Sequence, residues 1–223
     1  MPVRVNLKYI INGFSLLEMA IVLAIVGLLL ASLLPNLSAQ MEQQRRADTA
    51  KQSNEIRDAI YGYAIINGRL PCPAIASAVS GANNWGIADC TQTTGVIPWV
   101  TLGVTETDAW GRRLTYSVSS DFINANFTLT TTGELNVKTA ASAGTNLVTS
   151  TAAVIVSHGS NGWGAYTPQG TQMTVSSSAD EADNSNLGLT FVSHDFTPTF
   201  DDLVVWIPPN ILFNRMVTAG KLP

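Results

Sequence analysis

The stretch GFSLLEMAIVLAIVGLLLASLLP, residues 13–35, decides the fold of the N-terminal part of this chain. It follows a short leader that carries Arg4 and Lys8, and within the stretch Glu18 is the one charged residue. A helix over residues 14–34 would be ~31 Å long, enough to span the hydrocarbon core of a membrane. We therefore expect a membrane-spanning helix with the basic leader on the cytoplasmic side. A carboxylate inside such a helix is costly, so Glu18 calls for a cationic partner and a function.

Two plainer interpretations account for only part of this stretch. A secretory signal peptide would end in a small-residue cleavage site after its apolar core, but here the change in character lies before the core, between Gly13 and Phe14. An ordinary transmembrane anchor explains the apolar run and leaves Glu18 unexplained. Pro35 lacks an amide hydrogen and is predicted to kink the helix.

The residues at the start of the run match a known processing signal place by place. The matching residues are Gly13, Phe14, Ser15, Leu16, Leu17 and Glu18. They resemble the class III signal of type IV pilins and of type II secretion pseudopilins. The resemblance implies that prepilin peptidase cleaves between Gly13 and Phe14 and methylates the new amine of Phe14. It also implies that Glu18 pairs with the N-terminus of a neighbouring subunit during assembly.

A second helical pattern follows Pro35. Residues 38–55 are polar and show almost no apolar stripe, whereas from Ile56 onward apolar residues recur on one helix face. The members of this face are Ile56, Ala59, Ile60, Tyr63 and Ala64. Gly68 and Pro71 are stop signals. We expect one long helix whose second half carries a β-rich head.

Short β-type runs fill most of the remaining chain. Strands are predicted over residues 96–100, 114–118, 127–131, 135–137, 154–157, 189–193 and 203–207. A hairpin is predicted at residues 132–133, and the lack of polar alternation in 154–157 is typical of a central strand. Residues 176–186 are predicted to form a surface loop. After the last strand, Ile211, Leu212 and Met216 fit a short C-terminal helix that Gly220 would cap.

These elements indicate an α+β fold class. The segments DAWGRRLTYSV, at 108–118, and VSHGSNGWGAY, at 156–166, are similar to segments of major pseudopilins and minor pilins. The resemblance implies a type IV pilin-like fold, in which a long N-terminal helix, half transmembrane and half amphipathic, packs on an antiparallel sheet.

This interpretation divides the chain into four parts. They are a prepilin leader at 1–13, a transmembrane and filament-core helix at 14–35, a stalk and scaffold helix at 36–68, and a globular β-rich head at 69–223. We expect a single pass through the inner membrane, with the N-terminus cytoplasmic and the head periplasmic. After assembly the chain would belong to a pilus or a periplasmic pseudopilus.

Two cysteines, Cys72 and Cys90, lie in an irregular stretch rich in small and polar residues. Disulfides persist on the non-cytoplasmic side of a membrane, so we expect a bond, with two free thiols as the alternative. Such a bond would contribute ~3 kcal/mol to stability by restricting the unfolded chain.

The C-terminal region holds several candidate ligands for a cation. They are Asp180, Glu181, Asp183, Asn184, Asp195, Asp201 and Asp202. Their oxygens are of the hard kind that Ca²⁺ prefers, although their spacing is not that of an EF-hand. Acidic residues in the C-terminal loop of the major pseudopilins bind calcium, so the resemblance makes calcium a candidate cofactor. A metal-free acidic surface is the alternative, and no other cofactor is expected.

Composition and motifs speak against catalysis and nucleic-acid binding. The formal net charge is −4, and the arginine pairs at 45–46 and 112–113 are expected to be solvated or ion-paired. The two histidines, His158 and His194, each lie beside a serine or an aspartate. Adjacency in sequence is not triad geometry, and no GxSxG elbow is present. We therefore expect the histidines to lie in turns and the protein not to be an enzyme.

The expected function is that of a structural subunit, a minor pilin or pseudopilin, of a type IV pilus or type II secretion filament. Its partners would be prepilin peptidase, other pilin or pseudopilin subunits, the inner-membrane assembly platform and the membrane itself. The alternative is a filament-tip binding module, either an adhesin or a DNA-uptake minor pilin. Most tryptophans are expected to pack over the sheet, whereas an exposed Trp85 or Trp163 would mark a contact with a partner.

Overall fold

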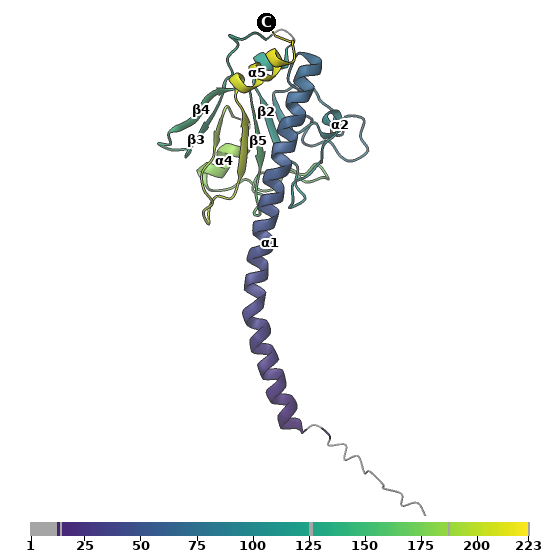
Figure 1. Ribbon diagram of the computed structural model, residues 1–223, viewed down its shortest axis with the longest axis vertical. Coiled ribbons are helices and arrows are strands. Elements are labelled where there is room, and N and C mark those ends of the chain that lie inside the picture. Colours follow the sequence, from purple (N-terminus) through teal and green to yellow (C-terminus); the bar gives the residue numbers. More distant parts are fainter. Residues whose placement is uncertain (1–12, 14, 125–126, 187, 223) are drawn as a thin grey trace, which may run out of the picture. The chain divides into compact units, whose positions relative to one another are not determined.

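A computed structural model describes residues 13, 15–124, 127–186 and 188–222, and for residues 30–36 it describes the backbone alone. The chain divides into two compact units, Met1–Gln43 and Gln44–Pro223. We call them the N-terminal unit and the globular unit and describe each by itself. Helix α1 (Leu16–Asn67) has residues in both, and the other helices and strands belong to the globular unit (Figure 1).

A serine caps the start of α1. The Oγ of Ser15 accepts a hydrogen bond from the backbone N–H of Glu18 (3.1 Å), which satisfies one of the free amides of the first turn. All side chains from residue 16 to residue 29 are exposed. The helix continues through Pro35, so the kink there stays a prediction. Phe14 lies outside the described residues.

The predicted membrane span is not found. Among the residues that the structure describes, no helix is at once long enough and apolar enough to cross a membrane. The prediction of a type IV pilin-like fold with a transmembrane half is therefore wrong.

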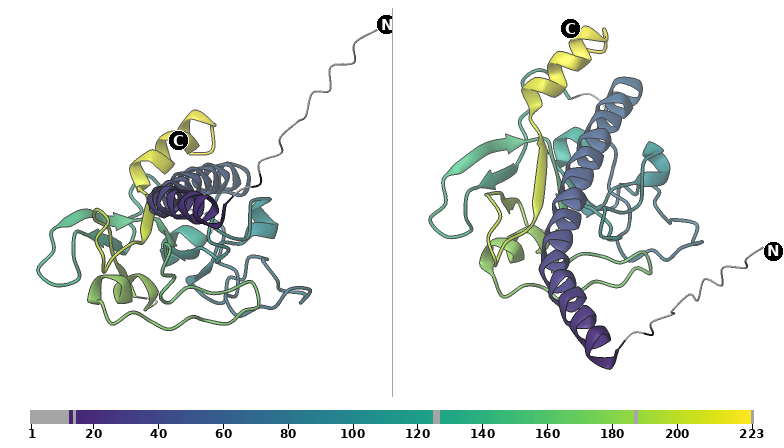
Figure 2. Two further views of the ribbon diagram at one scale, coloured as in Figure 1. Left: turned by 90° about the horizontal axis from the view of Figure 1, so that it is seen from below. Right: turned by 60° about the horizontal axis from the view of Figure 1, so that its bottom comes forward.

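In the globular unit, α1 buries one narrow face. The buried residues of this face are Thr49, Ser53, Ile56, Ile60 and Ala64, spaced three or four apart as on one side of a helix. Ile56, Ile60 and Ala64 share a core with residues of the main sheet, whereas Ala59 and Tyr63 of the predicted face are only half-buried. Figure 2 shows the second half of α1 lying across that sheet. The helix ends before Gly68, whose φ is 70° and whose N–H donates to the carbonyl of Ala64 (2.8 Å). This confirms the predicted stop.

The main sheet has four antiparallel strands in the order β1–β2–β5–β7. Their bounds are β1 (Thr94–Val96), β2 (Thr115–Val118), β5 (Ala153–Ser157) and β7 (Leu203–Ile207). Strand β5 lies between β2 and β7 and is buried along its whole length, which confirms the predicted central strand. Ile155 belongs to the core with α1, whereas Val154 and Val156 point to the other face and belong to a second core.

A second, three-stranded sheet covers that second core. Strand β3 (Leu135–Lys138) pairs antiparallel with β4 (Asn146–Thr151) and parallel with β6 (Thr190–Val192). Val137 and Phe191 from this sheet pack with Val154 and Val156. Strand β4 escapes sequence-based prediction because its residues are mostly exposed and show no apolar alternation.

The predicted hairpin at residues 132–133 is wrong. Residues 127–131 are turn and coil instead of a strand, and β3 finds its partners in β4 and β6. The N–H of Gly133 donates to the carbonyl of Ser150 (3.2 Å). A Cβ on Gly133 would collide with the backbone of Thr151. Gly133 is therefore needed because its backbone lies close to the backbone of Thr151, and not because it forms a tight turn.

Four short helices accompany the strands in the described part of the globular unit. They are α2 (Trp99–Leu102), α3 (Ser120–Ile123), α4 (Ala179–Ser185) and α5 (Pro209–Thr218). Pro98 precedes α2, which replaces the end of the strand predicted over 96–100. Helix α4 lies inside the predicted surface loop at 176–186 and buries Glu181, so that prediction is wrong. Helix α5 confirms the predicted C-terminal helix, and Gly220 follows its end with a φ of 67°.

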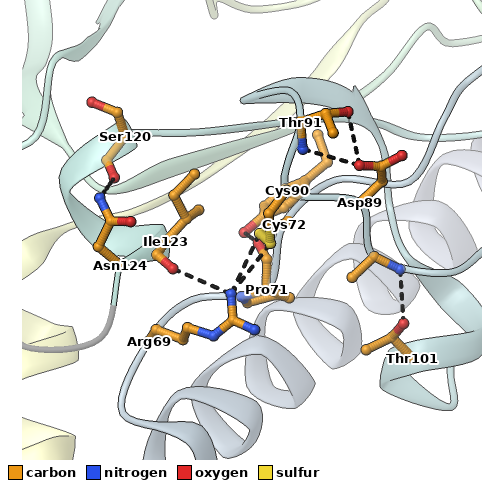
Figure 3. The surroundings of a disulfide bond; sticks show 12 residues. Arg69, Pro71, Cys72, Asp89, Cys90, Thr91, Thr101, Ser120, Ile123 and Asn124 are labelled. Atoms are coloured by element: carbon orange, nitrogen blue, oxygen red, sulfur yellow. Dashed lines mark hydrogen bonds between the residues drawn. A yellow bond between two sulfur atoms is a disulfide. The ribbon is translucent and has the colours of Figure 1, made fainter.

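Cys72 and Cys90 form a disulfide, which confirms the predicted pair. Figure 3 shows Arg69 beside the bond, with its Nη1 3.6 Å from the Cys72 Sγ and 3.2 Å from the Cys90 Sγ. The loop between the cysteines is anchored by Trp85, whose ring packs edge-on against Trp99 at 5.7 Å between centroids. The loop is therefore held at its ends by a covalent bond and in its middle by an aromatic contact.

Candidate functional site

The N-terminal motif is described only in part. Gly13 and Glu18 are exposed, and Glu18 lies in the first turn of α1. Phe14, the residue that cleavage would free, is not among the described residues. Cleavage after Gly13, methylation of Phe14 and pairing of Glu18 therefore stay predictions.

A group of three carboxylates is the best-formed site in the described part of the globular unit. Glu181 comes from α4, and Asp201 and Asp202 come from the turn before β7. One oxygen from each lies within 4.8 Å of the others. The residues are only 1%, 5% and 8% exposed, respectively. Burying three acidic groups together is unfavourable unless a cation or protons compensate the charge. We call Glu181, Asp201 and Asp202 the acidic cluster.

Each carboxylate of the acidic cluster is oriented by hydrogen bonds on one oxygen. The Oδ2 of Asp201 accepts from the N–H (2.8 Å) and hydroxyl (2.7 Å) of Ser160 and from the N–H of Asn161 (3.0 Å). The Oε1 of Glu181 accepts from the Asn161 Nδ2 (2.7 Å).

Asn184 of α4 completes this arrangement by donating its Nδ2 to the Oδ2 of Asp202 (2.7 Å). The Oδ1 atoms of Asp201 and Asp202 are buried and have no hydrogen-bond partner among the described residues. Buried polar atoms without a partner are rare and need an explanation.

His158 borders the acidic cluster, a position that the sequence did not indicate. It follows β5 directly and is fully buried, and its Nε2 is 2.8 Å from the Thr115 Oγ1. Its Nδ1 has no hydrogen-bond partner in the described part of the chain and is 4.0 Å from the Asp202 Oδ1. Burial, together with the nearby Arg112 charge, lowers the pKa of His158 to about 4, so the ring is neutral at pH 7 and brings no positive charge to the cluster.

Burial also raises the pKa of Asp202, and its acidic neighbours Glu181 and Asp201 act in the same direction. The folded state therefore holds the Asp202 proton more tightly than the unfolded state does. The stability that this proton provides is present at acidic pH and is lost as pH rises through the folded-state pKa. At neutral pH a cation can take the place of the proton.

The remaining predicted ligands lie apart from the acidic cluster. Asp180 accepts a hydrogen bond from the N–H of Ala141 (2.7 Å) and is 3.3 Å from the Nε2 of His194. Asp183 accepts from the side chain of Asn186 (3.1 Å) and is not part of the cluster. Of the seven candidates, the structure thus brings together three carboxylates and the amide of Asn184, and Asp195 is exposed elsewhere.

The arginine and serine residues singled out in the sequence have structural partners. Ser157 donates its hydroxyl to the Asp108 Oδ2 (2.6 Å), so its described partner is a carboxylate and not a histidine. Arg112 donates to the carbonyls of Gly159 (2.6 Å) and Ser160 (3.0 Å). Arg113 is fully buried.

The acidic cluster can hold a hard divalent cation. Ca²⁺ takes six to eight oxygen ligands, and the unpaired oxygens of the cluster supply a first set with fixed orientation. Carbonyl groups and water would supply the rest. Glu181, Asp201 and Asp202 are the residues that would hold the ion.

We predict that Ca²⁺ at saturating concentration stabilises the full-length chain. At one hundred times Kd, a ligand that binds only the folded state adds about 2.7 kcal/mol to the free energy of unfolding. For a unit of this size that corresponds to a rise of roughly 5–10 °C in Tm. Thermal unfolding with Ca²⁺ and with EDTA measures the difference.

Asp202→Asn and Asp183→Asn make a matched pair for this test. Asp202→Asn should abolish the response to Ca²⁺ and should not destabilise the chain in EDTA, because it removes a charge that burial penalises. Asp183→Asn, on the same helix as Glu181 but outside the cluster, should keep the full response. An equal shift in both variants, or none in the parent chain, would contradict the assignment.

No protein-family model, no curated protein and no solved structure matches this chain, so a function for it rests on the residues described above.

Proposed function

We propose that this chain is a structural subunit, a minor pilin or pseudopilin, of a type IV pilus or type II secretion filament. The observation that carries the proposal is the match of residues 13–18 to the prepilin signal, directly before a helix whose apolar side chains are exposed. Prepilin peptidase, other subunits of the filament and its assembly platform are the partners that follow from it.

The first turns of α1 offer a surface that copies of the chain can cover. Leu16, Leu17, Leu23 and Leu28 are 93%, 71%, 67% and 74% exposed. The stretch is apolar on all sides, a pattern that is stable in water only when other helices surround it. Burial of such surface stabilises an assembly by ~25 cal/mol per Å². The proposal uses this helix surface and requires no membrane span.

Glu18 gives the apolar surface a defined register. In a bundle of apolar helices its carboxylate would lose its water and would be destabilising without a cationic partner. The α-amine that cleavage frees on Phe14 of a neighbouring subunit is such a partner. Subunits in any other register would leave Glu18 unpaired.

The disulfide agrees with a filament that works outside the cytoplasm. Cys72–Cys90 lies at the end of the globular unit where α1 stops, and it ties the loop that follows the helix. Structural disulfides persist in oxidising compartments and are rare in the cytosol of most organisms.

The proposal predicts that prepilin peptidase cleaves the Glu18→Ala variant normally. The variant should enter filaments at least ~10-fold less than the parent chain, because a loss of ~1.4 kcal/mol in a subunit contact lowers its affinity tenfold. Mass spectrometry of the mature N-terminus reports cleavage and methylation. Immunoblots of sheared filaments from the native host report incorporation. Glu55→Ala, which removes an exposed carboxylate that pairs with Lys51 (3.7 Å), should behave as the parent chain.

A chain that keeps Met1 in cells with an active prepilin peptidase would contradict the proposal. Normal incorporation of Glu18→Ala would contradict the role of Glu18.

A further inference from the structure

A groove of about 430 Å³ lies beside the acidic cluster, between residues 161–163 and residues 174–178. We propose that this groove binds a neutral saccharide, with the indole ring of Trp163 as the platform for one face of a sugar ring. The site does not depend on the assembly function proposed above, because all of its residues lie in the globular unit.

Trp163 is exposed and is held in place before any ligand arrives. Its ring is 40% exposed, although an indole gains more from burial than almost any other side chain. The backbone N–H of Trp163 donates to the Asn161 Oδ1 (2.9 Å), and the backbone N–H of Gly164 donates to the carbonyl of Thr174 (2.8 Å). Gly162 has a φ of 65°, and the Arg112 guanidinium occupies the space that a side chain there would need. These contacts fix the backbone that carries the ring, and a preorganised loop lowers the entropy that binding must overcome.

The carboxylates below the groove fix its inner wall. The Asn161 side chain donates to Glu181 (2.7 Å), and the Asn161 N–H donates to Asp201 (3.0 Å). The loop that carries Trp163 is therefore tied to buried groups on α4 and on the turn before β7. A polar side chain that is itself hydrogen-bonded in this way is well placed to orient a ligand.

Hydroxyl groups line the opposite wall. Thr174, Ser177 and Ser178 line the groove, and their hydroxyls make no hydrogen bond with other described residues. Each hydroxyl can donate one hydrogen bond and accept others, so it can act as donor or as acceptor toward the hydroxyls of a sugar. Val175, which is 48% exposed, adds an apolar edge.

In the metal-free chain, the charge of the lining selects against anionic ligands. The groove has no lysine, arginine or histidine among its lining residues, and it includes the carboxylate of Glu181. Nucleic acids, phosphates and acidic sugars need cationic partners that this lining does not provide. A pyranose has an apolar face of C–H groups and a rim of hydroxyls, and an aromatic platform with a hydroxyl-rich wall complements both.

The test is a titration of the purified, unassembled full-length chain with neutral sugars, followed by tryptophan fluorescence. Glucose, galactose, mannose and N-acetylglucosamine are the probes, with sialic acid and a heparin oligosaccharide as anionic comparisons. We expect saturable binding of at least one neutral sugar below about 50 mM, as for a shallow single-ring site. Trp163→Ala should weaken it at least ~10-fold, and Trp163→Phe should keep most of it.

Phe196→Ala is the matched control. Phe196 is 58% exposed, lies outside the groove and stacks under the Arg46 guanidinium at 3.8 Å. This variant should bind the sugar as the parent chain does. Unfolding temperatures of all variants show whether a loss of binding is a loss of fold.

Three results would overturn the inference. The first is that no neutral sugar binds at about 50 mM, which corresponds to a binding free energy of less than about 2 kcal/mol. The second is that only anionic sugars bind. The third is that the parent chain and Trp163→Ala bind the sugar with equal affinity. Because the chain is tested unassembled, failure to form filaments does not affect the outcome.

Discussion

Arg113→Met should lower the free energy of unfolding of the globular unit by roughly 3 kcal/mol or more, because several acceptors around a fully buried guanidinium lose their donor together. Arg113 is 0% exposed, and its Nε and Nη2 donate to the Glu106 Oε1 (3.0 and 2.9 Å). It also donates to the carbonyls of Ala76, Ala78 and Pro168, each at 2.8 Å. Methionine fills similar volume but leaves these acceptors without a donor, and unpaired buried acceptors are destabilising.

Arg113 has this large effect because it joins three segments that have no regular structure. The carbonyl groups come from the loop within the disulfide and from the turn at residues 167–170, and Glu106 comes from the segment after α2. The guanidinium also lies over the ring of Trp99, at 4.8 Å from its centroid. Loss of one side chain therefore loosens several loops at once.

Arg215→Met is the control for this variant. Arg215 pairs with Asp58 at 3.2 Å, but both side chains are about half exposed (45% and 56%). Exposed pairs contribute ~0–1 kcal/mol, so this variant should unfold close to the parent chain. Urea denaturation followed by near-ultraviolet circular dichroism compares the two. Similar midpoints for Arg113→Met and the parent chain would contradict the role of Arg113.

Replacement of both cysteines by serine should lower the free energy of unfolding by ~3 kcal/mol, because the unfolded chain regains the freedom of a closed loop. The loop spans a sequence separation of 18. Hydrogen bonds such as those between Ala74 and Val96, and from Arg113 to Ala76 and Ala78, remain in the variant and keep the loss near this value. The anchor formed by Trp85 and Trp99 remains in the variant and limits the loss.

The parent chain in excess dithiothreitol should unfold at the same urea concentration as the double variant Cys72→Ser/Cys90→Ser. The variant itself should not respond to dithiothreitol. A double variant as stable as the oxidised parent chain would show that the native contacts of the loop, and not the bond, hold it in place.

Local patterns predicted several elements correctly. The apolar face from Ile56 onward and the stop at Gly68 describe the end of α1, and the unbroken apolar run in β5 indicated a central strand. The two cysteines were paired from compartment and loop composition alone. The helix and the strand could be predicted because helix periodicity and the apolar run of a buried strand are visible within a few consecutive residues.

Other elements depend on partners far along the chain. Strand β4 is largely exposed. Strand β3 pairs with β4 and with β6 instead of forming the predicted hairpin. Helix α4 has a polar, acidic sequence that is typical of a surface loop, yet it buries Glu181 against the turn before β7. Pairing of strands that are distant in sequence is not visible in local propensity.

The predicted membrane-spanning helix is not found among the described residues. Length and composition over residues 14–34 met the usual threshold for a span, but the described part of α1 does not contain a helix of that kind.

The amino-acid sequence by itself determined the end of the long helix at Gly68 and the cysteine pair, because each depends on residues that are close in the chain or on residue type alone. Only the tertiary structure decided which of seven possible ligands form the acidic cluster, that His158 borders it, and that Arg113 ties the loops together. Glu181 and Asp202 are brought together by the packing of α4 beside β6 and by the turn into β7. Their shared burial is a property of the fold, since the electrostatic cost of an ionised group is set by the groups around it and not by its neighbours in sequence.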